Sequence, residues 1–447
     1  MLRMPVRYRS LHRRTRSLPL LVSRAVSRLT SLTAHGRGRL PTATMCASLK
    51  ILLGRACPLG GIFATGVLVA RALGPRSYGL YSAAFALGAL TASGTTAGLP
   101  VLMMRRAAQR DIDSLTQKRA AVIQLGYSVS ASVLATVLGV VIFGGYFGAS
   151  AGLLAGAGAA ANNFATVAQS IHAGYRSYNR AVATDVTAGL LCPTLTVAAL
   201  YLHTGIIGSL AALLLAFSFS CVVAWMRLPE GLPRGEASHL GSFEALPLTI
   251  IGALNGAYAR VDAVVLVIVA GGTVTGLYSA AYRLLGPFAL LGSVFVTMFL
   301  TRLSEVASDP ARWSRLKRLG TVALVISTGL LVGVLVVLAP LLLRLFFGNG
   351  YVDAVTSSRL LLLSAIPWAC YTPMASALVS KHLEKRVSVA LLLGLGADIV
   401  LVFLLGHRFG AVGAAGAWLV SESAMFFGLL ALTGSTRRSV GGLRPEC

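Results

Sequence analysis

Apolar residues run along almost the whole chain in stretches of about 20, separated by short polar loops. A helix of about 20 apolar residues crosses the hydrocarbon core of a bilayer, whereas a barrel strand needs only about ten residues of alternating polarity. The pattern therefore predicts an all-α integral membrane protein with about twelve transmembrane helices. The expected spans are residues 45–70, 78–104, 119–147, 150–172, 181–203, 206–226, 241–270, 276–301, 319–343, 357–380, 387–406 and 411–433.

Composition and charge placement support this class. Hydrophobic residues make up 56% of the chain and charged residues 12%, about half the charged share of a soluble domain. The net charge of +25 could indicate nucleic-acid binding, but most Lys and Arg fall in loops on the same side of the expected bundle as the N-terminus. This is the positive-inside pattern. It predicts a multi-pass protein of the cell (inner) membrane with both termini cytoplasmic and no nucleic-acid partner.

The first 44 residues are rich in Arg and contain no acid, since the first acidic residue is Asp111. We interpret residues 1–44 as a basic, disordered tail attracted to anionic lipids. A targeting segment, or a translation start placed too far upstream, would explain the same composition.

Motifs for cofactors are absent from the sequence. The six cysteines form neither a CxxC pair nor a Cys/His cluster, and no GK[ST] motif for nucleotide phosphates occurs. We therefore expect no metal and no cofactor.

One short sequence occurs twice. GLYSAAF, residues 79–85, returns 197 positions later as GLYSAAY, residues 276–282, and GIIGSLAA, residues 205–212, resembles GAVGAAGA, residues 410–417. An even number of spans separates the copies, so the pattern predicts two six-helix lobes in parallel orientation around a central cavity. The offset grows from 197 to 205, which predicts about eight inserted residues in the second copy, in the loop at 344–356.

These patterns divide the chain into five parts. They are a tail (1–44), an N-terminal lobe (45–226), a cytoplasmic linker (227–240), a C-terminal lobe (241–433) and a cytoplasmic tail (434–447).

Two stretches carry a family resemblance. ARALGPRSYGLYSAAFAL, residues 70–87, resembles the first-loop signature of polysaccharide and O-antigen flippases, a branch of the multidrug/oligosaccharidyl-lipid/polysaccharide export superfamily. RVDAVVLVIVAGGTVTGLYSAAYRL, residues 260–284, resembles the seventh-to-eighth-helix signature of that family. The similarity extends over roughly residues 45–433. The signature residues are Leu73, Gly74, Pro75, Tyr78, Gly79, Tyr81, Gly276 and Tyr278.

The resemblance implies a transporter with alternating access. It would move a polyprenyl-diphosphate-linked oligosaccharide to the outer leaflet for the synthesis of lipopolysaccharide or exopolysaccharide. Membrane lipids, and a polysaccharide polymerase or glycosyltransferase, are the expected partners. In the signature itself we expect a tight turn at Pro75, with Tyr81 and Tyr278 near the outer membrane interface.

Ionisable residues inside spans are candidates for function because each costs roughly 2.5–3.5 kcal/mol at the bilayer centre. In the resemblance, helices 1 and 7 face each other across the cleft, which would place Arg55, Arg260 and Arg283 there. Arginine binds phosphate oxygens in a bidentate manner, so we expect these three to bind the substrate diphosphate. Alternatively, Arg260 pairs with Asp262 or another acid only to lower the insertion cost.

Three acids are candidates for ion coupling, namely Asp262, Asp398 and Glu422. Asp262 could alternate between a proton and an arginine partner. No two acids are four residues apart on one span, so the sequence does not encode an obvious sodium site.

Two other functions remain open. A multidrug or cation antiporter of the same superfamily is the main alternative, although the excess of Arg over acids inside the membrane disfavours a cationic substrate. A membrane glycosyltransferase or polymerase is less favoured, because the longest outward loop, residues 344–356, offers too few reactive side chains. We therefore expect no enzymatic activity.

Overall fold

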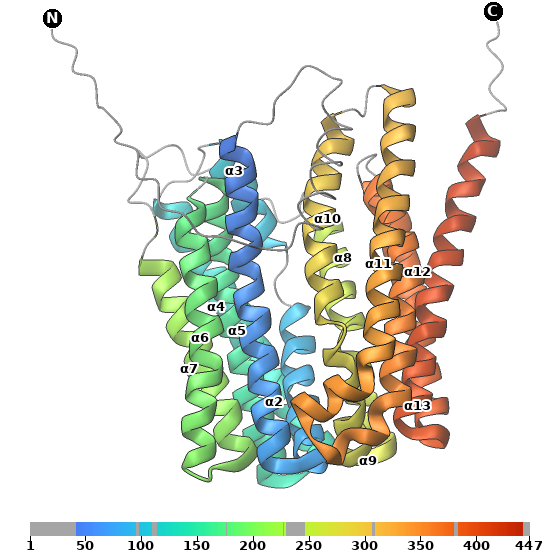
Figure 1. Cartoon of the computed structure of the whole chain (residues 1–447). Helices are drawn as coiled ribbons and strands as arrows, with labels where there is room; N and C mark the ends of the chain where they lie inside the picture. Colours follow the sequence, from blue (N-terminus) through green and yellow to red (C-terminus); the bar gives the residue numbers. More distant parts are fainter. Residues whose placement is uncertain are drawn as a thin grey trace, which may run out of the picture. The chain divides into compact units, whose positions relative to one another are not determined.

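The computed structural model describes residues 42–94, 98–109, 114–175, 177–226, 228, 246–305, 309–379 and 383–440. The tail expected at 1–44 and the linker expected at 227–240 thus lie almost wholly outside the described residues. The described part is helical throughout, without strands (Figure 1). Its elements are α2 (Thr42–Ser93), α3 (Leu99–Gln109), α4 (Ser114–Phe143), α5 (Gly145–Gly174), α6 (Tyr178–Tyr201), α7 (Gly205–Met226), α8 (Leu246–Tyr258), α9 (Val261–Arg283), α10 (Gly286–Glu305), α11 (Pro310–Phe347), the 3₁₀ helix η1 (Asn349–Ala354), α12 (Val355–Val379) and α13 (Glu384–Val440).

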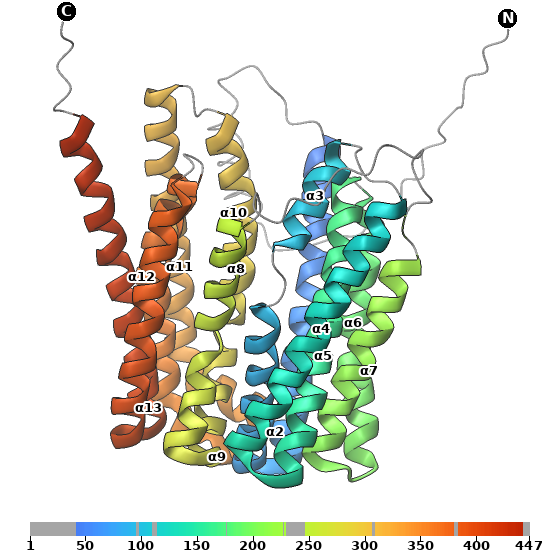
Figure 2. The same cartoon turned by 180° about the vertical axis from the view of Figure 1, so that it is seen from behind.

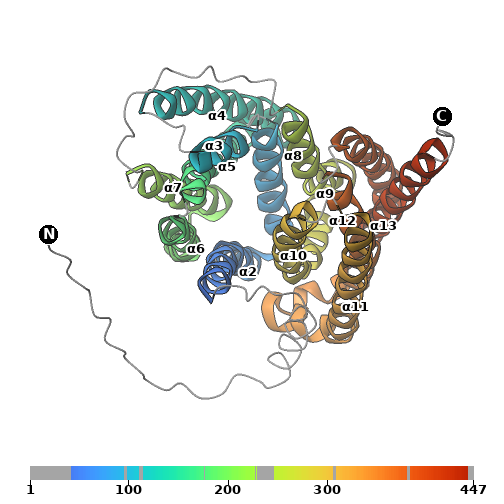
Figure 3. The same ribbon diagram turned by 90° about the horizontal axis from the view of Figure 1, so that it is seen from above.

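The helices form two lobes, as expected. Helices α3 to α7 pack on one another, and so do α8 to α13 (Figures 1 and 3). Helix α2 belongs to the first lobe, where Gly61 lies against the backbone of Gly189 in α6 and Gly88 against Ala155 in α5. The all-α, two-lobed fold class is therefore confirmed. The last helix continues to Val440, into the stretch expected to be a tail from residue 434.

Eight stretches of the described chain are long and apolar enough to cross a membrane. Three of them reverse direction at an internal glycine and so include parts of two expected spans each, namely Ala56–Ser93, Ile250–Arg283 and Lys385–Ala431. Helix α5 adds a crossing that is richer in Gly and Ala than in large apolar residues. Counted in this way, the described helices account for the twelve spans that the sequence predicts.

The internal repeat is visible in the backbone. Gly74 has φ 75° and ψ 174°, and Gly271, 197 positions later, has φ 79° and ψ 177°. This conformation is essentially restricted to glycine. Gly205 and Gly410, which the second sequence match pairs, also share a positive φ, of 65° and 59°. Equivalent helices in the two lobes therefore turn back at equivalent glycines.

The inserted residues lie in a helix and not in the loop at 344–356, where the sequence placed them. Helix α4 has 30 residues and its counterpart α11 has 38. Gly144 follows the first and Gly348 the second, both with positive φ, so the offset has already grown before residue 348. The prediction was wrong because two extra turns of apolar helix, about 12 Å, leave no local sequence signal.

The repeated heptapeptides pack against each other. A methyl group added to Gly79 would lie 1.7 Å from the carbonyl oxygen of Gly272, and one added to Gly276 would lie 2.0 Å from that of Pro75. Pro75 and Gly272 are themselves repeat partners, so the contact is reciprocal. The two copies of the signature are therefore where α2 and α9 cross (Figure 2, lower end), and only glycine permits so close an approach.

Further contacts join the lobes near this crossing. Arg71 of α2 donates from Nε to the carbonyl oxygen of Phe346 at 2.8 Å and from Nη2 to that of Leu345. The Tyr351 hydroxyl donates to the carbonyl oxygen of Ala70 at 3.1 Å. Since Arg71 binds the last carbonyls of α11, it also suits the negative end of that helix dipole. We call these contacts, together with the Gly79–Gly276 crossing, the reversal-end contact.

Candidate functional site

The C-terminal lobe holds a cluster of three buried acids, Asp262, Asp398 and Glu422. Asp262 is the first of them along the chain. Its side chain is 2% exposed in the first turn of α9. One carboxylate oxygen accepts a hydrogen bond from the backbone N–H of Ala263 at 2.7 Å, and the other accepts from the hydroxyl of Tyr278. The reversal at Gly271 brings Tyr278, 16 residues further on, back beside Asp262.

Asp398 and Glu422 lie on the two arms of α13, on either side of Gly410. They are 0% and 3% exposed. Both oxygens of Asp398 and Oε2 of Glu422 lack a hydrogen-bond partner among the described residues. Asp398 is close enough to interact electrostatically with Asp262 and Glu422, so the structure brings the three predicted acids into one cluster.

A small cavity of about 210 Å³ opens beside Glu422. Its walls are largely aromatic: the ring of Tyr258 stacks on Trp418 at 4.7 Å, and the ring of Tyr282 meets Trp418 edge-on at 5.5 Å. The phenol groups of Tyr258 and Tyr371 face the Glu422 carboxylate. A cavity of this size has room for about seven waters at roughly 30 Å³ each, and Glu422 is the acid of the cluster that lines it.

The cluster is not a preformed metal site. Among the described residues, no group of three His, Cys, Asp or Glu side chains converges closely enough to hold a metal ion. The N-terminal lobe has no matching acids either. The repeat offsets place Thr65 opposite Asp262, Pro193 opposite Asp398 and Phe217 opposite Glu422. The buried carboxylates are therefore a specialisation of one lobe.

Arg283 bridges the lobes. Its Nε donates to the Tyr78 hydroxyl at 2.5 Å and its Nη1 to the carbonyl oxygen of Ile62 at 2.6 Å. The guanidinium occupies the space that a side chain at position 66 would need, since a methyl on Gly66 would lie 2.0 Å from Cζ. Two N–H groups of the guanidinium thus donate to protein acceptors and are not directed into an open cavity.

The other two arginines are placed differently. Arg260 precedes α9, and its guanidinium lies 5.3 Å from the ring centroid of Phe85 in α2, a cation–π contact between lobes. Arg260 and Asp262, although both are described, form no ion pair. Arg55 lies in α2, and its side chain is outside the described residues. The diphosphate-binding role of the three arginines stays a prediction.

Replacing Arg283 by Ala is expected to lower the free energy of unfolding by about 1.5–3 kcal/mol, because hydrogen bonds from a charged donor to Tyr78 and Ile62 are lost. Arg283→Lys should recover only part of this, since a lysine cannot reach both acceptors in a fork. Thermal unfolding in detergent measures the effect, with exposed Arg359→Ala as the control. Equal stability of Arg283→Ala and Arg359→Ala would contradict the bridging role.

The signature tyrosines are internal. Tyr81 and Tyr278 are each 1% exposed, so their rings do not contact lipid as interfacial anchors, and their level near the outer interface stays a prediction. The tight crossing of α2 and α9 turns these rings inward, where Tyr81 stacks on Tyr78 at 6.3 Å and Tyr278 binds Asp262. Tyr78 in turn accepts the hydrogen bond from Arg283. The signature therefore builds the contact between lobes.

A family model described as "Polysaccharide biosynthesis protein" matches residues 68–356. That range covers more than half of the chain and includes both repeated heptapeptides. The chain belongs to this family. No curated protein matches it by sequence.

Solved structures place this polysaccharide biosynthesis family member in the fold of the multidrug/oligosaccharidyl-lipid/polysaccharide (MOP) export superfamily. An inward-facing multidrug resistance MATE transporter has a TM-score of 0.69 at 15% identity, over 87% of this chain and 98% of that one. An outward-facing MATE transporter gives 0.61 at 16% identity, over 90% and 97%. A MOP superfamily transporter from Pyrococcus furiosus gives 0.63 at 16%, over 90% and 97%. The chain is thus a multi-pass membrane protein with this two-lobed fold.

Sequence reasoning missed several residues around the family member's polar cluster and crossing. Trp418 precedes Glu422 by four positions, which is the spacing of neighbours on one helix face, and Tyr258 precedes Asp262 by four across the break between α8 and α9. That spacing is a signal that could have found them. Tyr371 and the carbonyls that bind Arg71 come from distant helices, and no pattern in the sequence points to them.

Proposed function

We propose that the protein is a flippase that moves a polyprenyl-diphosphate-linked oligosaccharide from the cytoplasmic to the outer leaflet, for the synthesis of a cell-surface polysaccharide. The reciprocal contact of two repeated lobes at one end carries this proposal. Two like bundles that touch at one end can separate there while they close at the other end, and such rocking is how repeat-built transporters alternate access. Membership of the polysaccharide biosynthesis family supports the substrate class.

The orientation follows from charge. Basic loops lie at the helix ends opposite the glycine reversals, where α4 begins with Lys118 and Arg119 nearby and α11 begins next to Arg312. By the positive-inside rule these ends would be cytoplasmic, as the sequence predicts for both termini. In this orientation the reversal-end contact closes the outer side, and substrate would enter from the cytoplasmic side. The higher TM-score with the inward-facing transporter is consistent with this state.

Energy would come from protons that bind the C-terminal lobe's acids. A buried carboxylate without a partner is costly, and a proton removes the charge. Asp398 and Glu422 have unpartnered oxygens, and Glu422 reaches the small cavity. Tyr278 links Asp262 to the arm of α9 after Gly271, which crosses α2, so the charge state of the cluster has a direct route to the contact between lobes.

A cation or drug antiporter is the second candidate. The aromatic cavity beside Glu422 favours it, because aromatic rings and a carboxylate together attract cations. Its volume of about 210 Å³ is below the usual 300–1,000 Å³ of pockets for drug-sized ligands. We therefore favour the flippase.

The deciding experiment is transfer of a fluorescent polyprenyl-diphosphate sugar across proteoliposomes that contain the purified protein. We expect the labelled lipid to become accessible on the opposite leaflet faster than in protein-free liposomes, and an imposed proton gradient to increase the rate. Transport of ethidium without any movement of the labelled lipid would favour the antiporter. A polymerase or glycosyltransferase that consumes the flipped product would be the expected functional partner.

A further inference from the structure

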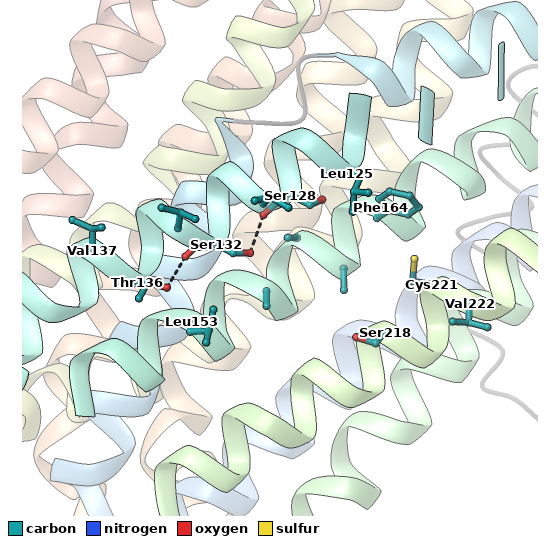
Figure 4. Close-up of a pocket in the computed structure, with 15 residues that line it drawn as sticks. Leu125, Ser128, Ser132, Thr136, Val137, Leu153, Phe164, Ser218, Cys221 and Val222 are labelled. Carbon is teal, nitrogen blue, oxygen red and sulfur yellow. Dashed lines mark hydrogen bonds between the residues drawn. The ribbon is translucent and has the colours of Figure 1, made fainter. Parts of the chain in front are cut away.

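A membrane-facing groove in the N-terminal lobe is independent of the sites described above. It has a volume of about 780 Å³ and runs over α5 between α4 and α7 (Figure 4). Small residues of α5, including Ala157 and Ala161, form its floor. Its rim is apolar, with Val129 56% exposed and Val133 57% exposed. Side chains that large and apolar are exposed only because the surrounding solvent is lipid.

The groove offers almost nothing polar to an occupant. The Ser132 hydroxyl donates to the carbonyl oxygen of Ser128 at 2.8 Å, and Thr136 donates to that of Ser132 at 2.7 Å (Figure 4). Both hydroxyls are therefore bonded to their own helix, and of the groove's hydroxyls only that of Ser128 is buried without a partner. A hydrocarbon chain is the chemistry that fits such walls.

The dimensions indicate a lipid chain and not a helix. The α4 wall runs from Leu125 to Val137, which is about 18 Å at 1.5 Å per residue. That is close to the thickness of one leaflet, about 15 Å, and well short of the roughly 30 Å that a spanning partner helix would cover. The volume divided by this length gives a cross-section of roughly 40 Å², about half that of a helix 10–12 Å wide.

A basic residue near the groove favours an anionic lipid over a neutral one. Lys118 is exposed and stands seven residues before Leu125 on α4, so it lies on the same helix face, two turns nearer to the proposed cytoplasmic surface. A lysine at this level attracts an anionic head group. We propose that the groove is a binding site for an anionic phospholipid, with an acyl chain between α4 and α7 and the phosphate at Lys118.

Native mass spectrometry of the full chain tests this, with dioleoyl-phosphatidylglycerol and dioleoyl-phosphatidylcholine added separately in detergent. We expect Lys118→Ala to weaken phosphatidylglycerol binding about fivefold, the effect of one basic residue, and to leave phosphatidylcholine unchanged. Arg119→Ala is the matched control, because it removes the same charge about 100° around the helix. It should leave both lipids bound as in the wild type.

A second pair of variants tests whether a lipid acyl chain occupies the groove. Ala157→Phe fills the floor of the groove and should remove the binding of both lipids, whereas Val141→Phe adds the same ring on α4 outside the groove and should not. If Ala157→Phe fails to fold, Ala161→Leu replaces it in the test. The leucine fills less of the groove, so we expect an intermediate loss of lipid binding. Equal phosphatidylglycerol loss in Lys118→Ala and Arg119→Ala would overturn the proposal, as would retained lipid in a folded Ala157→Phe variant. A dimer that Ala157→Phe dissociates would assign the groove to a second copy and would also overturn it.

Discussion

Replacing Gly79 or Gly276 by Ala is expected to open the reversal-end contact. The added methyl would lie 1.7 Å from the Gly272 carbonyl oxygen or 2.0 Å from that of Pro75, and both obstacles are backbone, which cannot rotate away. Overpacking of this kind costs about 1–3 kcal/mol, so the ratio of closed to open protein should fall roughly 5- to 150-fold. Because the contact is reciprocal, the two substitutions should have similar effects although they lie in different lobes.

Distances between spin labels on the two lobes measure this result. Labels at exposed Arg76 and Val352, near the reversal-end contact, should report a short distance in the wild type and a longer, broader distribution in either glycine variant. Gly126→Ala is the control, since a methyl there meets no other atom within 4 Å. An unchanged distance in a folded Gly276→Ala variant would refute the crossing as the closing contact.

Replacing Glu422 by Gln, or Asp398 by Asn, is expected to uncouple transport from the proton gradient. The amide keeps the shape of the side chain but cannot take up or release a proton. The stimulation of labelled-lipid transfer by the gradient should fall by roughly 5- to 150-fold, the usual range of coupling between two sites. The variants should unfold no earlier than the wild type, because they remove buried charges at Asp398, where both oxygens lack a partner, and at Glu422, where Oε2 lacks one.

Asp353→Asn is the matched control for these variants, since Asp353 is exposed and lies outside the cluster. Its transport should respond to the gradient as in the wild type. If Glu422→Gln and Asp398→Asn both keep full stimulation by the gradient, the cluster does not couple protons to transport. If both lose thermal stability as well as activity, their role is structural.

The repeat was predictable because short, nearly identical sequences mark it in both halves of the chain. GLYSAA occurs in both halves, and Gly74 and Gly271 then prove to share one backbone conformation. Span lengths and parallel orientation follow from hydrophobicity and from the even number of helices between copies. The insertion was misplaced because helix α11 simply continues for two more turns.

The site was only partly predictable. Insertion cost singles out Asp262, Asp398 and Glu422 one by one, and the structure brings them together because the reversals at Gly271 and Gly410 fold each hairpin back on itself. The same cost argument also selected Arg283, whose guanidinium proves to bind α2 across the lobes. Hydropathy measures what burial costs, but it contains no information about which partner on another helix offsets that cost.

A disulfide across the reversal-end contact tests the central claim most directly. A Cβ added at Gly350 would lie 3.8 Å from Cγ of Pro75, so these two positions are adjacent across the contact. The Pro75→Cys/Gly350→Cys pair should therefore cross-link readily under oxidant, while each single variant should not. If transport requires this contact to open, labelled-lipid transfer stops on oxidation and returns on reduction. Transfer at an undiminished rate through a fully cross-linked protein would contradict alternating access between the two lobes.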